Sequence, residues 1–451
     1  MSPRTVVRKR SGTERPSVTN EFDLSLEDVE TSSASLGAPG WLARRRQAAF
    51  ESYRKMAMPT LQDEPWRRTD IRSLPSASVS LSPCDDLPVD RALLAPLAGE
   101  ENAAQIVLRP GRPSKVTGDG SLAAQGVVFC DWSTAVREHA DLLKGHLGQV
   151  VPDDEGKFSA LAAGLAADGI LAYVPSGVQV AAPLHSVMWA PGNRQLFLSR
   201  LLVVVEDGAS LTFVHESASP TEAEGAAIHS GIVELSVGDN ARLTFVELQN
   251  WGEHVWNFTH ERSRVGRDSQ IDWVFGAVGS HLTKNFTELD LAGQGSTGRM
   301  SGFYFTDGIQ HLDHDTQQNH LAPNTTSDLL FKGALVGRSR SVWQGMIYVA
   351  PGAQKTDGYQ ANRNLILSER ARADSIPGLE ILADDVRCTH GATVGQLEDE
   401  PVFYLMSRGL ARPDAERLVV DGFFSPIMER IPFEDVRNRF AGMIDDKMRS
   451  R

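Results

Sequence analysis

The residues best suited to chemistry are a cysteine and a histidine two positions apart, Cys388 and His390. If this segment is a β-strand, the two side chains project from the same face of it. A soft thiolate beside an imidazole suits iron–sulfur, zinc or copper chemistry. The structural alternative is a buried free cysteine next to a hydrogen-bonded histidine, because free cysteine is among the most buried residue types.

The number of cysteines limits what the chain can do with such a pair. The sequence contains three, Cys84, Cys130 and Cys388, which is too few for a disulfide framework in a chain of 451 residues. A stable iron–sulfur cluster normally takes four protein ligands, mostly thiolates. We therefore expect a second subunit to supply ligands if the chain handles a cluster.

A second group of candidate ligands is the run His311, Asp313, His314 and Asp315, followed by His320. On a strand, residues 311 and 314 would face opposite ways and could not bind one metal ion. We interpret the run as a polar loop between structural repeats. The sequence also has neither a phosphate-binding Gly-x-x-x-x-Gly-Lys-Ser/Thr loop nor the Gly-x-Ser-x-Gly motif of many hydrolases.

Charge and hydropathy narrow the class of protein. The formal net charge is -13 and no basic stripe follows the first residues, so nucleic acid is not an expected partner. No apolar run reaches the roughly 18 residues of a membrane helix. Together with the few cysteines, this predicts a cytoplasmic protein that does not bind membranes. Residues 1–35 are polar and acidic, and we predict a disordered tail.

Three further regions follow the tail. Residues 36–168 combine short apolar segments with amphipathic helices, the first of them over about 41–56 and ended by Pro59, and predict an α+β domain. Residues 169–395 carry short runs rich in β-branched and aromatic residues, punctuated by Gly, Asp and Asn. Residues 396–451 return to helical spacing and end in an apolar stripe over about 433–448.

The β-rich region contains an internal repeat. The segment 207–214 (DGASLTFV) matches 239–246 (DNARLTFV), and a weaker copy follows at 269–274 (SQIDWV). A period of roughly 30 residues built from strand–turn units predicts stacked coils of a solenoid. A sandwich and a propeller stay open, but the short connections favour a parallel β-helix. The amides Gln354, Gln360, Asn362 and Asn364 would then stack on neighbouring coils.

The later motifs resemble the SufB/SufD family of iron–sulfur cluster assembly proteins. The resemblance is carried by AQKTD at 353–357, ADSIPGLEI at 373–381, CTHGATVG at 388–395 and FYLMSRG at 403–409. It implies a mainly β fold, a right-handed parallel β-helix core flanked by N-terminal α+β and C-terminal helical regions. It also implies a non-catalytic scaffold in a complex with a SufB-type subunit and a SufC-type ABC ATPase.

The same resemblance assigns roles to residues. Ile381 stands where SufB-type chains carry a cluster-building cysteine, and Gly391 replaces their glutamate, so the chain follows the SufD-type branch. This implies that His390 contacts a transient cluster shared with the SufB-type partner, with Cys388 as second choice. The C-terminal helices would bind the SufC-type ATPase through a set of four residues, Phe403, Leu405, Arg408 and Leu418.

Several questions stay open at this level. Cluster type, the participation of a reduced flavin and homodimer formation without the SufB-type partner do not follow from the residues. The enzyme alternative is a β-helix acting on glycans or acyl groups. The structural alternative is a purely architectural subunit that never touches the cluster.

Overall fold

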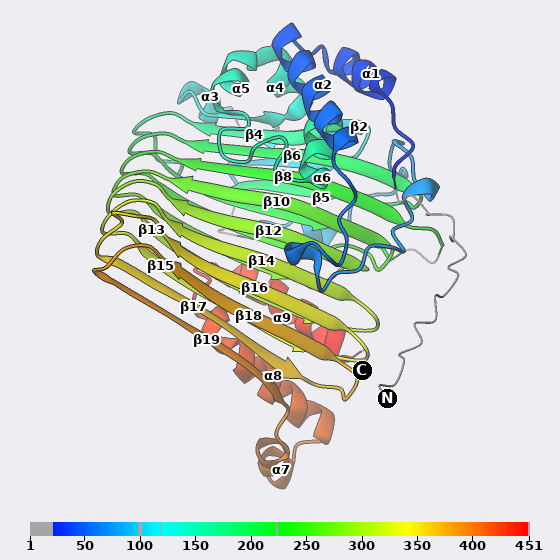
Figure 1. Ribbon diagram of the computed structural model, residues 1–451. Helices are drawn as coiled ribbons and strands as arrows, with labels where there is room; N and C mark the ends of the chain where they lie inside the picture. Colours follow the sequence, from blue (N-terminus) through cyan, green and yellow to red (C-terminus); the bar gives the residue numbers. More distant parts are fainter. Residues whose placement is uncertain (1–20, 98–101, 119, 222–223, 450–451) are drawn as a thin grey trace, which may run out of the picture.

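The computed structural model of the chain describes residues 21–97, 102–118, 120–221 and 224–449. Its centre is a β-helix made of two facing sheets, with helices at both ends of the chain (Figure 1). The mainly β fold and the solenoid expected from the repeat are thereby confirmed. Among the described residues, no helix is both long and apolar enough to cross a membrane.

From β4 on, successive strands alternate between the two sheets, so one strand of each makes a coil. Sheet A contains β3 (Val128–Asp131), β4 (Asp168–Val174), β6 (Gln195–Val205), β8 (Ala227–Val237), β10 (Val255–Val265), β12 (Leu282–Leu291), β14 (His311–His320), β16 (Arg340–Val349) and β18 (Arg372–Ile381). Sheet B contains β1 (Ala104–Arg109), β2 (Arg112–Gly118), β5 (Leu184–Trp189), β7 (Ser210–Ala218), β9 (Arg242–Asn250), β11 (Gln270–Ala277), β13 (Thr297–Thr306), β15 (Thr326–Leu335), β17 (Thr356–Ile366) and β19 (Val386–Gln396). Outside β2 and β3, neighbouring strands run parallel in each sheet.

The sequence repeat is visible as aligned strands. Leu243 in β9 lies opposite Leu211 in β7 and Ile271 in β11. Two positions further, Phe213, Phe245 and Trp273 form a column of aromatic rings, with centroids 5.9 and 5.6 Å apart. Because side chains alternate along a strand, repeated apolar residues fill the interior in every coil.

The amide residues of the later coils are arranged differently from the expected ladder. Gln360, Asn362 and Asn364 follow one another along β17 rather than standing on neighbouring coils. Asn364 Nδ2 donates to Asn362 Oδ1 at 2.6 Å, and Asn362 Nδ2 donates to the Tyr304 hydroxyl at 3.2 Å. The amides therefore satisfy one another along the strand and across the interior.

The N-terminal region covers one end of sheet A (Figure 1). Its main helices are α1 (Leu26–Leu36), α2 (Gly40–Lys55) and α6 (Lys157–Leu165), with the smaller α3 (Ser121–Ala124), α4 (Trp132–Glu138) and α5 (Ala140–His146). The prediction of a disordered tail over 1–35 is wrong for α1, whose Val29 and Leu36 are buried. The apolar residues of α1 are few and lie among serine and glutamate residues, so the sequence did not predict this helix. Residues 1–20 lie outside the described residues.

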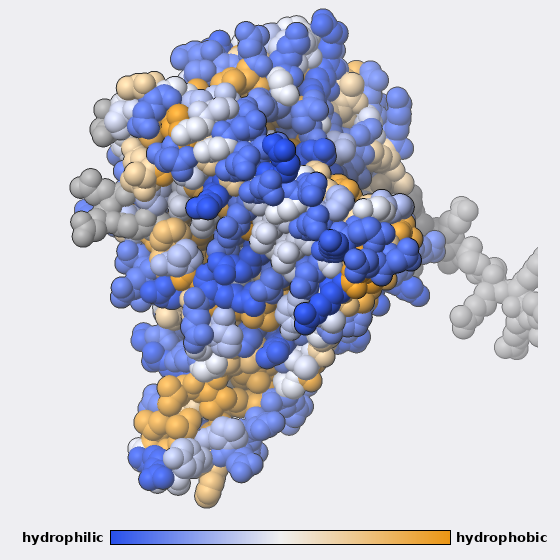
Figure 2. Space-filling model, turned by 90° about the vertical axis from the view of Figure 1, so that its left-hand side faces the viewer, coloured by the Kyte–Doolittle hydropathy of each residue, from blue (hydrophilic) through white to orange (hydrophobic). Residues whose placement is uncertain are grey.

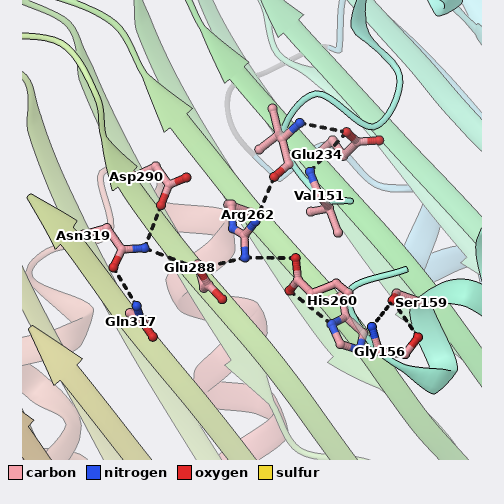
Figure 3. Close-up of polar contacts among 12 residues, drawn as sticks. Val151, Gly156, Ser159, Glu234, His260, Arg262, Glu288, Asp290, Gln317 and Asn319 are labelled. Atoms are coloured by element: carbon pink, nitrogen blue, oxygen red, sulfur yellow. Dashed lines mark hydrogen bonds and ion pairs between the residues drawn. The ribbon is translucent and has the colours of Figure 1, made fainter. Parts of the chain in front are cut away.

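A polar network ties the loop before α6 to the outer face of sheet A (Figure 3). Arg262 on β10 donates to the Val150 carbonyl at 3.0 Å and pairs with Glu288 on β12 at 2.8 Å. Glu234 on β8 accepts the backbone N–H of Val151 at 3.3 Å. The charged outward positions of neighbouring strands thus hold the N-terminal region in place.

Three helices end the chain, α7 (Asp399–Ser407), α8 (Arg412–Met428) and α9 (Glu434–Arg449). The rings of Phe440 on α9 and Phe424 on α8 pack against Phe303 of β13, with centroids 4.1 and 5.8 Å away. These contacts place α8 and α9 over the outer face of sheet B. α7 continues beyond the last coil, at the lower end of the molecule (Figure 1).

Candidate functional site

His390 lies on β19, the strand that ends sheet B. It stands in register with Gln360 of β17, and no described strand pairs with the opposite edge of β19. The same holds for β18 at the end of sheet A. The last coil of the β-helix therefore presents two free strand edges.

The imidazole of His390 belongs to the inward-facing positions of the solenoid. Gln360, its neighbour in register, is buried and donates to the carbonyls of Gly345 and Gly378 at 3.3 and 2.9 Å. Parallel strands in register direct such side chains to the same face. His390 is nevertheless exposed, because no described coil follows it.

Cys388 shares this face but is half-buried. A Cβ atom placed on the opposite residue, Gly358, would lie only 3.2 Å from its sulfur and 3.3 Å from His320 Nε2. Burial raises the pKa of the Cys388 thiol, which keeps it protonated at neutral pH. The cysteine thus has the environment of a packed thiol, and His390 is the more accessible of the two.

The backbone of β19 alternates between a paired and a free edge. The backbone N–H of Leu397 donates to the Ile366 carbonyl, so the backbone N–H and C=O groups of odd-numbered residues in β19 point to β17. The backbone groups of even-numbered residues, His390 included, point to the free edge. In β18 the N–H of Leu382 bonds to Val349, so the odd-numbered Pro377 lies at the free edge. Proline has no N–H to donate, and an edge is where a strand tolerates it.

The last coil, which carries His390, also exposes apolar side chains. Four residues of the last coil expose between 37% and 50% of their surface, namely Leu379, Ile381, Leu382 and Val394. Hydrophobic surface gathers at this lower end of the molecule (Figure 2). Free strand edges with adjacent apolar side chains are a template for adding a strand from another chain.

Comparison with known proteins indicates the family of this chain. A family model described as the SufBD core domain of SUF system FeS cluster assembly matches residues 188–423, and a SufBD N-terminal region model matches 114–185. The iron–sulfur cluster assembly protein SufD of Bacillus subtilis (strain 168) is 31% identical over 95% of this chain and 99% of its own length. The chain belongs to the SufBD family. The expectation drawn from the sequence motifs is thereby confirmed.

Other SufBD relatives match over a shorter span. The SufB protein of Bacillus subtilis (strain 168) is 30% identical over 69% of this chain and 67% of its own length. A SufBD family protein of Staphylococcus saprophyticus shows the same identity and coverage. Of these three relatives, the SufD protein matches nearly the whole chain, in agreement with the branch predicted from Ile381 and Gly391.

The C-terminal SufBD helices carry a second exposed apolar surface. On α7, Phe403 is 72% exposed and Tyr404 is 56% exposed, while Val402 is buried and anchors the helix. Leu405 is half-buried, and the Arg408 guanidinium lies 5.2 Å from the centre of the Tyr404 ring. Leu418 on α8 is half exposed. Three of the four residues predicted for partner binding are therefore exposed, and Leu405 is partly covered.

The histidine–aspartate run of this SufBD chain is a strand and not the predicted loop. It forms β14, where its neighbours β12 and β16 pair with every residue from His311 to His320. His311 faces outward and its Nε2 lies 2.8 Å from the Thr69 hydroxyl, whereas the buried His314 packs inside against Phe275 and Tyr304. Within the part of the chain that the structure describes, no three His, Cys, Asp or Glu residues converge on a metal position.

The sequence did not predict the apolar rim of the last coil, which consists of the exposed side chains of Leu379, Ile381, Leu382 and Val394. Leu379, Ile381 and Val394 have the alternation of interior residues, and only their place in the final coil exposes them. A hydrophobic strand without a following repeat is the signal that could have revealed this rim.

Proposed function

We propose that this chain is a non-catalytic scaffold subunit of the SUF system, which presents His390 to a nascent iron–sulfur cluster at an interface with a SufB-type subunit. The observation that carries the proposal is an exposed imidazole between free strand edges and apolar side chains. Imidazole is a suitable ligand for iron.

The cysteine positions favour a shared cluster. Cys84 and Cys130 are buried, Cys388 is half-buried, and all three are free thiols. Because a cluster normally takes four ligands, most of them must come from the partner. The partner is expected to add strands to the edges of β18 and β19, which would cover the apolar rim and bring its thiolates beside His390.

The exposed residues of α7 and α8 support a second contact, with a SufC-type ATPase. Phe403 and Leu418 offer apolar anchors, and Arg408 stacked on Tyr404 offers a positioned charge. Aromatic residues and arginine are enriched in protein interfaces. Because α8 packs on sheet B, a movement of the ATPase would be transmitted to the β-helix as a rigid body.

The test is reconstitution of the complex from this chain, a SufB-type subunit and a SufC-type ATPase under anaerobic conditions. His390→Ala should lower bound iron and acid-labile sulfide per complex while the subunits still copurify. Thr389→Ala is the matched control, since Thr389 is an exposed neighbour on the opposite face of the same strand. Undiminished cluster content in His390→Ala would favour the architectural alternative, in which the subunit only positions its partners.

A further inference from the structure

A groove separates α1 from the turn of the β1–β2 hairpin at the end of the molecule opposite to His390. The helix α1 lies at the top of the molecule, beyond the first coils (Figure 1). The groove consists of two adjacent hollows of about 290 and 430 Å³. Ser35 of α1, Gly111 of the turn and Asp168 at the start of β4 line both hollows. Volumes of this order hold a small organic molecule.

Asp168 is the charged residue that the two hollows share, and it lacks a counter-charge. Among the described residues, a single donor reaches its carboxylate, the backbone N–H of Gly111, at 3.4 Å from Oδ1 and 3.1 Å from Oδ2. No Lys, Arg or His in the described part of the chain forms an ion pair with it. Because an ionised carboxylate accepts up to about four hydrogen bonds, most of its capacity is open to a donor in the groove.

The smaller hollow has an acidic lining. Its charged residues are Asp168 and Asp28 of α1, and no basic residue of the described chain lines it. Arg112 and Arg137 line only the larger hollow, where Asp131 stands beside them. A cation in the smaller hollow would therefore meet two carboxylates and no positive charge, which favours a ligand with a positive charge.

The rest of this lining suits an aliphatic chain. Buried leucines face the smaller hollow, Leu165 from α6 and Leu196 and Leu198 from β6. Thr31 and Ser35 of α1 add hydroxyl groups. Ligand sites typically combine an apolar lining with a few polar groups that fix the orientation of the ligand.

We propose that this groove binds a small aliphatic amine, whose ammonium group pairs with Asp168 and whose carbon chain lies against the leucines of the smaller hollow. Asp28 provides a second carboxylate, so a short diamine matches the lining better than a monoamine. The groove and His390 lie at opposite ends of the solenoid, so the site does not depend on the function proposed above.

Putrescine is the probe, and its binding to the purified full chain is measured by calorimetry at pH 8. Burial raises the pKa of Asp168 to about 7, so at this pH the carboxylate is ionised while the amine keeps its charge. We expect one saturable site per chain. The uncharged 1-butanol has a carbon chain of the same length and should not displace putrescine. Displacement by 1-butanol at equal concentration would show a merely apolar cavity and overturn the proposal.

Two variants test the residues of the groove. Asp168→Asn keeps an oxygen that accepts the Gly111 N–H, and it should weaken putrescine binding by about tenfold or more, because the charge is lost. Ser35→Trp fills the groove without a change of charge and should weaken binding as strongly. Asp384→Asn, at an exposed position of the last coil, is the matched control and should leave the affinity unchanged.

The absence of saturable binding to the wild type would overturn the proposal, and so would undiminished binding to Asp168→Asn. If circular dichroism shows that Asp168→Asn does not fold, Ser35→Trp decides the question, since Ser35 is exposed on α1 and its replacement leaves the core intact. Undiminished binding to a folded Ser35→Trp chain would place the amine outside the groove and refute the site.

Discussion

His390 and Gln360 stand side by side in register on adjacent parallel strands, yet the glutamine is buried and the histidine is exposed. The two residues occupy equivalent inward positions of successive coils. What separates them is the coil that covers Gln360, since β18 and β19 have no described successor. This relationship leaves an inward-facing position open at the end of the solenoid.

The free edge of β19 should be essential for binding the SufB-type partner. Ala392→Pro removes an N–H at the free edge and leaves the bonds to β17 intact, so we expect weaker copurification with little change in stability, within about 0.5 kcal/mol. The measurements are pull-down yield and urea unfolding. Thr393→Pro removes an N–H directed at β17 and should destabilise the chain itself. Unchanged partner binding in Ala392→Pro would argue against strand addition at this edge.

The exposed face of α7 should be needed for the SufC-type ATPase. Phe403→Asp introduces a charge on the most exposed aromatic residue of the helix, and we expect at least about 2 kcal/mol weaker binding by calorimetry. Ile309→Asp is the control, since Ile309 is 65% exposed on a turn of the β-helix away from α7. Equal losses in both variants would indicate a non-specific effect of surface charge.

The ion pair of Lys284 and Asp313 should be a strong stability determinant. Their atoms lie 3.0 Å apart and both side chains are fully buried beneath the segment that carries Thr69. Asp313→Ala would remove negative charge from beside the buried Lys284 ammonium. We therefore expect the free energy of unfolding to fall by about 3 kcal/mol. Urea denaturation measures it, with the exposed Asp384→Ala as control. A loss below about 1 kcal/mol would show that water reaches the lysine.

Asp168 should make stability depend on pH. Burial raises its pKa to about 7, and its carboxylate accepts the Gly111 N–H at 3.1 Å. A raised carboxyl pKa means that the folded state holds the proton longer than the unfolded state, so stability falls as pH rises between about 4 and 7. Asp168→Asn removes this dependence.

The measurement compares urea unfolding at pH 5.5 and pH 8. Relative to the wild type, Asp168→Asn should gain about 2 kcal/mol of stability over that interval. All other titrating groups are common to both chains and cancel in the difference. An identical pH profile for the two chains would show that Asp168 is ionised normally in the folded protein.

The sequence by itself predicted stacked coils, because the strand–turn units repeated at 207–214, 239–246 and 269–274 bury their apolar faces by stacking, and it favoured the β-helix over a sandwich or a propeller. It also determined the family and the pairing of Cys388 with His390 on one face, since both follow from local motifs and from strand alternation. The terminal helices followed from apolar spacing, except α1, whose short stripe is diluted by serines.

Only the tertiary structure decided which inward positions are open and which are sealed. Leu379 and Val394 have the same alternation as buried core residues, and their exposure depends on being in the last coil. Likewise, the hydroxyl of Thr69 lies 2.8 Å from Nε2 of His311 although 242 residues separate them along the chain. Local sequence fixes the face of the strand from which a side chain projects. Its exposure to solvent and its neighbours depend on contacts between segments distant along the chain.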